Sequence, residues 1–340
     1  MKRVVTFGEI MLRLNPPGYQ RLIQAVEFEA SYAGGEANVA ASLAQFGVNA
    51  VYVTKVPSNE IGQCAVNEMR RFGVDTKNIL RGGERLGIYF VEKGASQRAS
   101  KVIYDRANSA IALARPDEFN WKQIFNDTDW FHFTGITPAL SDNAANVCMD
   151  AVSIAHDLGI PVSCDLNYRR KLWTKEKANV VMSRLMPYVD LCIANEEDAS
   201  DVFGIQALNS DIDKGELNLE AYTVVAEEII RRFGCKWVAI TLRGSISASE
   251  NEWSGMLYGN GKAYFAANYK VHIVDRVGGG DSFGAALIYG LLMEYDNQRT
   301  INFAVAASCL KHSIEHDFNL VTVEEVGALA AGNASGRVQR

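Results

Sequence analysis

Residues 275–286 read Asp275-Arg276-Val277-Gly278-Gly279-Gly280-Asp281-Ser282-Phe283-Gly284-Ala285-Ala286, and this stretch carries the strongest structural signal in the chain. Three consecutive glycines permit backbone angles that other residues resist, and they remove side-chain bulk. The apolar positions that follow predict a helix beginning at about Ser282. Because the first amides of a helix are unpaired and its dipole is positive there, we expect this segment to bind an anion.

An acidic residue at such a helix start is unusual for a plain phosphate cradle. Asp281 could take the proton from a hydroxyl that attacks a phosphate, while the amides of Gly278, Gly279 and Gly280 hold the group being transferred. The alternative is that Asp281 only caps the helix after a flexible turn. The chain contains no GxxxxGK[ST] segment and no GxGxxG after its first strand, so neither a Walker-type site nor a dinucleotide-binding Rossmann domain is favoured.

Around this segment, short apolar runs alternate with segments of helical spacing, which predicts an α/β fold with mostly parallel strands and right-handed crossovers. The apolar runs predict strands at 4–7, 50–53, 130–133, 162–164, 191–193 and 237–240. Apolar positions three and four apart, each series closed by a glycine, predict helices at 37–44, 61–72 and 147–158.

Two segments interrupt this alternation, at 12–33 and 85–107, and we expect them to form a small antiparallel β-sheet that covers the ligand site as a lid. Residues 87–92 and 100–104 predict a hairpin around Gly94. The main domain then comprises 1–11, 34–84 and 108–340. Exposed edges of a lid sheet favour pairing with a second copy, so a homodimer is expected.

The composition is that of an ordinary globular chain of 340 residues, with 48% hydrophobic and 22% charged residues and a net charge of 34 − 40 = −6. This mild acidity gives no electrostatic signature of nucleic-acid or anionic-membrane binding. No apolar run approaches the roughly 20 residues of a membrane span, and the N-terminus has too few apolar residues for a signal peptide, so we expect a cytoplasmic protein. Six singly placed cysteines predict buried free thiols rather than a zinc site.

A second glycine-rich segment lies near the N-terminus, where Gly34, Gly35, Glu36, Ala37 and Asn38 open a helix of small residues. The backbone can approach a ligand closely here, and the Asn38 side chain offers both a donor and an acceptor. Taken alone, the segment could equally be a tight turn before a closely packed alanine helix.

Together, the two glycine-rich segments resemble the signatures of the ribokinase-like carbohydrate kinases, and their order and spacing fit that family over essentially the whole chain. The resemblance implies a three-layer α/β/α domain with a small β lid, ATP as phosphate donor, Mg²⁺, and a sugar hydroxyl as acceptor. It also implies that Asp281 is the general base and that residues 34–38 contact the sugar.

Within the family, two further segments resemble kinases of 2-keto-3-deoxygluconate, which are Asp165-Leu166-Asn167-Tyr168-Arg169 and Tyr104-Asp105-Arg106-Ala107-Asn108-Ser109-Ala110. Arginine suits the planar carboxylate of a sugar acid. The resemblance therefore implies that Arg106 and Arg169 bind this carboxylate, that Tyr89 and Tyr104 add hydroxyl contacts, and that the 6-hydroxyl is phosphorylated. Surface ion pairs and lid packing remain alternatives for these residues. Alternatives for the whole chain are a fructokinase or other ketose kinase and a catalytically silent sugar-binding regulator.

For the nucleotide side, the resemblance implies a set of ATP contacts made by Asn167, Arg169, Asn195, Thr241, Arg243, Gly244, Gly278, Gly280 and Ser308. Residues 241–247 stand where the family has a Gly-x-x-Gly loop, although only Gly244 is present here. In Asn195-Glu196-Glu197-Asp198, the resemblance implies that Asp198 helps to place Mg²⁺ through water. It further implies a monovalent cation, K⁺ for example, at Asp275 and Val277.

Overall fold

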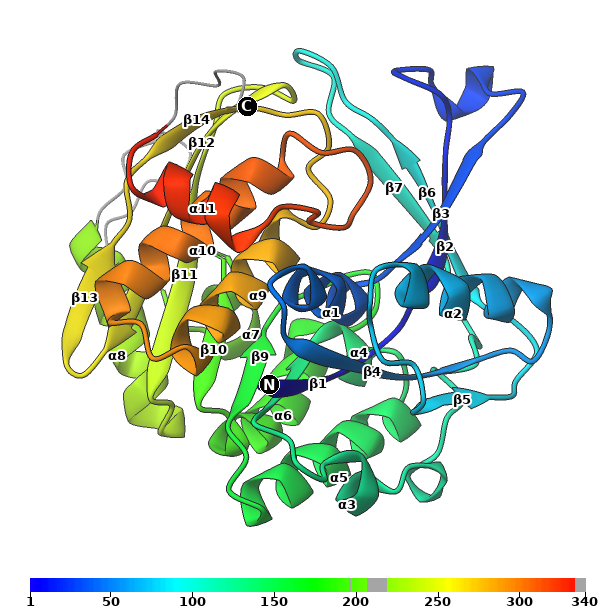
Figure 1. The fold of residues 1–340 in the computed structure, drawn as a ribbon, viewed down its shortest axis with the longest axis horizontal. Coiled ribbons are helices and arrows are strands. Elements are labelled where there is room, and N and C mark those ends of the chain that lie inside the picture. Colours follow the sequence, from blue (N-terminus) through cyan, green and yellow to red (C-terminus); the bar gives the residue numbers. More distant parts are fainter. Residues whose placement is uncertain (196, 207–218, 334–340) are drawn as a thin grey trace.

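The computed structural model describes residues 1–195, 197–206 and 219–333, and its centre is a large, mostly parallel β-sheet (Figure 1). The strands follow the order β13-β12-β11-β10-β9-β8-β1-β4-β5. All six predicted strands are confirmed, and they run parallel to one another: β1 (Arg3–Phe7), β4 (Asn49–Val56), β8 (Trp130–Thr134), β9 (Val162–Asp165), β10 (Leu191–Ala194) and β11 (Trp237–Ser245). Sequence reasoning did not identify β5 (Ile79–Arg81), or the antiparallel edge of β12 (Glu250–Gly259), β13 (Lys262–Phe265) and β14 (Tyr269–His272).

Helices cover both faces of this sheet, so the predicted three-layer arrangement is confirmed. On one face, α1 (Gly35–Gln45), α9 (Gly279–Leu292) and α10 (Asn297–Lys311) enclose one apolar core. On the other, α5 (Asp142–Asp157) and α8 (Leu219–Phe233) enclose a second one. The remaining helices are α2 (Glu60–Arg71), α3 (Trp121–Ile124), α4 (Ile136–Ala139), α6 (Lys175–Leu185), α7 (Asp198–Phe203) and α11 (Val323–Ala330), with single 3₁₀ turns at Leu22–Gln24, Pro116–Glu118 and Met186–Tyr188.

The helix predicted from about Ser282 begins three residues earlier, at Gly279. Gly278 precedes it in the left-handed conformation, with φ of 83°, and allows the chain to turn directly into the helix. The pattern-based boundary was wrong because glycines carry no apolar signal, whereas packing of α9 against α1 and α10 extends the helix. Asp281 therefore lies within the first turn of α9.

The two interrupting segments form a separate sheet in the order β3-β2-β6-β7, built from β2 (Met11–Asn15), β3 (Glu29–Ala33), β6 (Gly87–Glu92) and β7 (Lys101–Asp105). The predicted β6–β7 hairpin is confirmed. The expectation of a wholly antiparallel sheet is wrong, because the central pair β2–β6 is parallel. In the chain, β2 follows β1 and β6 follows β5. Because β1 and β5 run in the same direction in the main sheet, the chain leaves both strands at the same edge, and β2 and β6 therefore start in the same direction.

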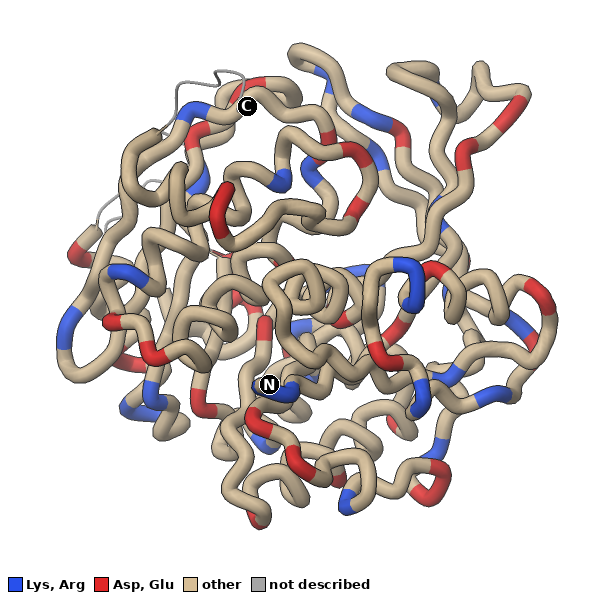
Figure 2. Tube along the Cα trace, in the orientation of Figure 1, with Lys and Arg blue, Asp and Glu red and all other residues tan. Residues whose placement is uncertain are grey.

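Charged residues of both signs are interspersed along the trace, as Figure 2 shows, which agrees with the balanced composition. Among the described residues, no helix is long and apolar enough to cross a membrane. The cysteines are free, and Cys148, Cys164, Cys192 and Cys235 are buried as expected, but Cys64 is exposed.

Candidate active site

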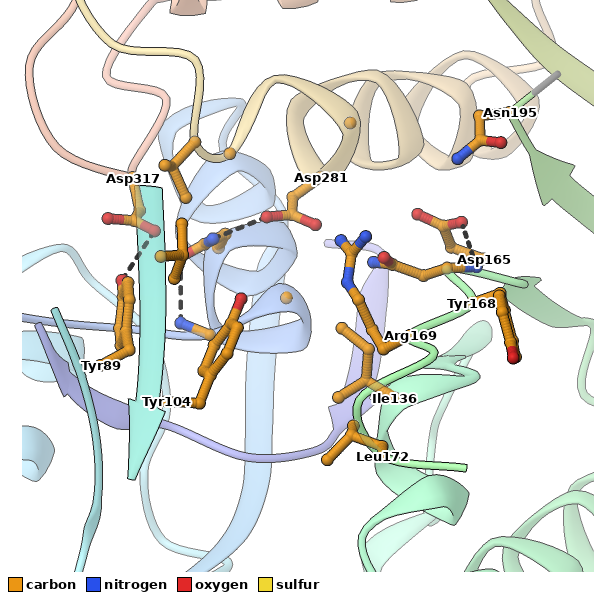
Figure 3. A pocket seen from close by; sticks show the side chains of 18 of the residues that line it. Tyr89, Tyr104, Ile136, Asp165, Tyr168, Arg169, Leu172, Asn195, Asp281 and Asp317 are labelled. Atoms are coloured by element: carbon orange, nitrogen blue, oxygen red, sulfur yellow. Dashed lines mark hydrogen bonds between the residues drawn. The ribbon is translucent and has the colours of Figure 1, made fainter. Parts of the chain in front are cut away.

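A cavity of about 1230 Å³ lies at the carboxyl ends of the parallel strands, bordered by the small sheet. Open α/β sheets bind their ligands at this edge. The cavity is lined by both glycine-rich segments, by Tyr89 and Tyr104 of the small sheet, and by the loops that follow β9 and β10 (Figure 3). Segments from all parts of the chain therefore converge on one site.

The central contact of the site joins the two glycine-rich segments. The Asn38 amide donates a hydrogen bond from Nδ2 to Oδ2 of Asp281, at 2.6 Å, although the two residues are 243 positions apart in the sequence. The Gly34 amide donates to Oδ1 of Asn38 at 3.3 Å and fixes the orientation of the Asn38 side chain. Burial raises the pKa of Asp281 to about 6, and the hydrogen bond from Asn38 opposes this rise. A carboxyl group with this pKa is suited to accept a proton near neutral pH.

The three glycines before Asp281 are not equivalent. A side chain at Gly278 would begin 2.0 Å from the main-chain oxygen of Asp317, so the two loops touch there. Gly279 packs against His312, and its amide donates to the Arg276 carbonyl at 3.4 Å. Gly278 and Gly280 line the cavity, whereas Gly279 does not. The expectation that all three amides face the transferred group therefore needs correction, because Gly279 supports the loop from behind.

A buried ion network ties the small sheet to this loop. Arg13, on β2, donates from Nη2 to Asp275 and from Nη1 to Asp317, both at 2.6 Å. Asp317 also accepts the Tyr89 hydroxyl at 2.8 Å (Figure 3). Arg13, Asp275 and Asp317 are at most 4% exposed. Sequence reasoning did not identify Arg13 or Asp317, because they pair with each other across 304 positions and no local pattern marks either residue.

The two arginines expected to bind a carboxylate differ in their surroundings. Figure 3 shows Arg169 extending toward the space between Asp281 and Asp165, and it makes no ion pair with any residue that the structure describes. Arg106, by contrast, is buried and paired with Glu9 through Nε, at 2.7 Å, and through Nη2. Glu9 also accepts the Ser109 hydroxyl at 2.5 Å. The positive charge of Arg106 is therefore already balanced, which the sequence did not indicate.

The first turn of α1 also departs from expectation. Glu36 is almost completely buried, and its Oε1 accepts hydrogen bonds from the Thr134 amide and hydroxyl and from the Thr137 hydroxyl, at 2.6–3.0 Å. Its carboxylate thus anchors α1 to β8 and the turn that follows. Burial raises the pKa of Glu36 to about 7, while these hydrogen bonds oppose the rise. Ala37 is fully buried in the core and does not line the cavity, whereas Gly34, Gly35, Glu36 and Asn38 do.

Most of the residues expected to contact ATP line the cavity: Asn167, Arg169, Asn195, Thr241, Arg243, Gly278 and Gly280. Gly244 is not in a glycine loop, because β11 continues to Ser245 and pairs with β12. Ser308 is fully buried and donates its hydroxyl to the Gly279 carbonyl at 2.7 Å, so it supports the glycine segment instead of facing the cavity. Further cavity residues that sequence reasoning did not assign are Asp165, Trp253, Arg276 and His312.

Asp198, which was expected to help place Mg²⁺, binds two loops together. Its Oδ1 accepts the Tyr168 amide at 3.0 Å and its Oδ2 accepts the Asn195 amide at 3.1 Å. Glu196 of the same motif lies outside the described residues. No cluster of three or more potential metal ligands occurs in the part of the chain that the structure describes.

Comparison with known proteins supports this interpretation of the cavity. The family model described as pfkB family carbohydrate kinase matches residues 1–313. The chain belongs to the pfkB family of carbohydrate kinases. A solved structure of 2-dehydro-3-deoxygluconokinase from Thermotoga maritima is 53% identical, with a TM-score of 0.94 over 97% of this chain and 98% of that one. A pfkB family carbohydrate kinase from Listeria grayi is 34% identical, with a TM-score of 0.90 over 97% and 100%. A 2-dehydro-3-deoxygalactonokinase from Haloferax volcanii is 32% identical over 98% of both chains.

Membership of the pfkB family makes this chain a carbohydrate kinase with a ribokinase-like fold. Kinases must place an acceptor hydroxyl, a base and an anion site within one cavity. Asn38, Gly278, Gly280 and Asp281 lie together at this cavity, with Asn38 bonded to Asp281.

Proposed function

We propose that this pfkB kinase transfers the γ-phosphate of ATP to the terminal 6-hydroxyl of 2-keto-3-deoxygluconate. The observation that carries this proposal is Arg169, a cavity arginine beside Asp281 that has no carboxylate within ion-pair distance among the described residues. A guanidinium in this position is suited to a planar anion such as the carboxylate of a sugar acid. The name of the Thermotoga maritima relative supports the same substrate.

In the proposed reaction, the Asp281 carboxylate takes the proton of the 6-hydroxyl while the hydroxyl oxygen attacks the γ-phosphorus. The bond from that phosphorus to the bridging oxygen of ADP breaks, and ADP leaves with the electron pair. Asn38 holds the carboxylate in position through its 2.6 Å hydrogen bond. Amides at the start of α9, at Gly278 and Gly280, stabilise the charge on the transferred group.

Mg²⁺, when bound with the nucleotide, would neutralise charge on the phosphates. Asp198 is the candidate to orient its water shell, because its buried carboxylate lines the cavity between the loops that carry Tyr168 and Asn195. Asn195 and Asn167 line the same part of the cavity and would contact the nucleotide, together with Thr241 and Arg243.

The sugar would lie against the small sheet. The rings of Tyr89 and Tyr104 stack with their centroids 6.0 Å apart, and the guanidinium of Arg106 lies 5.2 Å from the Tyr104 ring centroid. Because Glu9 balances the charge of Arg106, we assign the sugar carboxylate first to Arg169. Because the charge of Arg106 is already balanced, a neutral ketose such as fructose is the second candidate substrate.

The decisive experiment is an ADP-release assay with a panel of acceptors. It should include 2-keto-3-deoxygluconate, its 4-epimer 2-keto-3-deoxygalactonate, 5-keto-2-deoxygluconate and fructose. We expect the highest kcat/KM with 2-keto-3-deoxygluconate. A preference for fructose over every sugar acid would reject the specificity, and no turnover with any acceptor would reject the activity.

We expect Arg169→Leu to lower kcat/KM for the sugar acid at least about tenfold, because losing a charged hydrogen bond costs about 1.5–3 kcal/mol. Turnover of a neutral sugar should fall much less, so the ratio of the two values is the quantity to measure. Arg231→Leu, which removes an exposed arginine paired with Glu228, is the matched control. Equal losses on both substrates would assign Arg169 to the phosphates of ATP instead.

We also propose a homodimer formed through the small sheet. Its segments expose apolar side chains, with Ile23 at 89%, Val26 at 97% and Ile103 at 52% exposure. Such residues, beside unpaired sheet edges, favour association with a second copy. Sedimentation equilibrium should give the mass of two chains, and Val26→Asp combined with Ile103→Asp should give one. A wild-type monomer at micromolar concentration would contradict the proposal.

A further inference from the structure

Lys311, at the end of α10, is a lysine with no exposed surface. Its ammonium group lies between two main-chain oxygens, 3.4 Å from the Asp275 carbonyl and 3.2 Å from the Ile314 carbonyl. Burying a charged amine is costly unless the surroundings compensate it. Lysine is rarely buried completely, so the position calls for a physical explanation.

The two carbonyls belong to the two loops that form the anion end of the cavity. Asp275 begins the segment that leads to Gly278 and Asp281, and Ile314 begins the turn that leads to Asp317. These loops also touch directly, where Gly278 meets the Asp317 carbonyl. The Lys311 ammonium therefore donates hydrogen bonds to both loops, one of which leads into α9.

Four buried charged groups lie together around this site. Arg13 and Lys311 supply two positive charges, and Asp275 and Asp317, which both pair with Arg13, supply two negative ones. All of them are at most 4% exposed. Burial lowers the pKa of Lys311, while the carboxylates of Asp275 and Asp317 oppose this shift. Asp281 adds a third carboxyl that acts on Lys311. A further monovalent cation is nevertheless disfavoured, because the Lys311 ammonium already faces the main-chain oxygens of Asp275 and Ile314 and would repel a second positive charge there.

The geometry also leaves Asp275 unsuited to hold such a cation, contrary to the expectation from the sequence. Its Oδ2 binds Arg13 at 2.6 Å and its Oδ1 accepts the Val277 amide at 3.1 Å. Its main-chain oxygen is the one that faces the Lys311 ammonium. Main-chain carbonyls are the ligands that K⁺ takes in proteins, and an ammonium group binds the same oxygens as a hydrogen-bond donor.

We infer that the Lys311 ammonium takes the place of a bound monovalent cation, and that it is a positioning residue that holds the 275–281 and 314–317 loops together. The enzyme should accordingly work without K⁺. The inference rests on the proposed role of Gly278 and Gly280 in holding the transferred phosphate. It concerns how that loop is held, and it does not depend on which sugar is the acceptor.

The first test uses the unmodified enzyme. Its kcat and its affinity for MgATP should agree within about twofold in KCl, NaCl, NH₄Cl and tetramethylammonium chloride at equal ionic strength, since screening is then the same. Activation by K⁺ of about tenfold or more over tetramethylammonium would overturn the inference, whatever happens to the variants.

The second test removes the ammonium group. Lys311→Ala should lower kcat by about 10²-fold, since a loop displaced by about 1 Å costs that much, with little change in KM for the sugar. NH₄⁺ or K⁺ should restore activity and raise the melting temperature, because an ion that binds only the folded state stabilises it. Tetramethylammonium, which is too large, should do neither.

Two further variants keep the result interpretable. Lys311→Met fills the space without a charge, so it should be as impaired as Lys311→Ala but insensitive to NH₄⁺. Lys262→Met, at an exposed lysine next to Tyr264, should behave like the wild type. The melting temperature and MgATP affinity report on Lys311 even if no tested sugar is the true acceptor. Normal turnover of Lys311→Met, or Lys311→Ala impaired but unaffected by every cation, would reject the assignment.

Discussion

Asp281→Asn is expected to lower kcat by about 10²–10⁴-fold, the range that a positioned general base contributes. Asparagine keeps the size of the side chain and one oxygen that can accept the Asn38 hydrogen bond, but it cannot take a proton. The melting temperature should not fall, because the variant removes a carboxyl group whose burial disfavours its charge. Near-normal turnover in ADP release would eliminate Asp281 as the base.

The pH dependence provides an independent check on the same residue. With a pKa of about 6, Asp281 is protonated below that pH and cannot accept the hydroxyl proton. The value of kcat/KM should therefore fall by about tenfold per pH unit below pH 6 and level off above it. Asn38→Ala removes a hydrogen bond that lowers this pKa, so the descending limb should move to higher pH. An unchanged profile in Asn38→Ala would show that another group controls the limb.

The second large effect is expected for Arg13→Met, which should lower the free energy of unfolding by about 3–5 kcal/mol. The substitution leaves Asp275 and Asp317 buried without their shared cation, and this penalty is a large part of the usual total stability of about 5–15 kcal/mol. Urea unfolding followed by tryptophan fluorescence would measure it. Activity should also fall, because Arg13 links the small sheet to the loop that carries Gly278.

The matched control is Arg85→Met, which removes an arginine next to the same small sheet. Arg85 pairs with Asp105 at 2.8 Å, but the two side chains are 35% and 57% exposed. Exposed pairs contribute about 1 kcal/mol or less, so this variant should be nearly as stable as the wild type. Adding Asp317→Asn to Arg13→Met should recover part of the lost stability by removing one stranded charge. Equal stability of the two arginine variants would contradict a structural role for the buried network.

Local pattern is sufficient for six parallel strands of the main sheet, though not for the short β5. Apolar strands and glycine-closed helices repeat with clear periods, and the segment 278–281 combines backbone freedom with an acid, so the pattern marks Asp281 as a candidate. A helix cap stayed the alternative until the second glycine-rich segment gave the resemblance to carbohydrate kinases. The parallel direction of β2 and β6 is not predictable in this way, because it depends on the direction of β1 and β5, the main-sheet strands that precede them. The start of α9 was misplaced for a similar reason, since packing against α1 and α10 extends it over glycines.

The α/β class, the glycine-rich segment 278–280 and the candidate residues Asp281, Arg106 and Arg169 are each marked by a few neighbouring residues, so they can be recognised from the amino-acid sequence. Which of these groups remain available for chemistry depends on contacts that form only when the chain folds. In the folded chain, Glu9 forms an ion pair with Arg106, and the Thr134 hydroxyl donates a hydrogen bond to Glu36. The Ser308 hydroxyl donates to the Gly279 carbonyl, and the Lys311 ammonium donates to the Asp275 carbonyl. The physical reason is that the charge and hydrogen bonds of a buried group depend on partners up to 304 residues away, as for Arg13 and Asp317, and no local pattern records such partners.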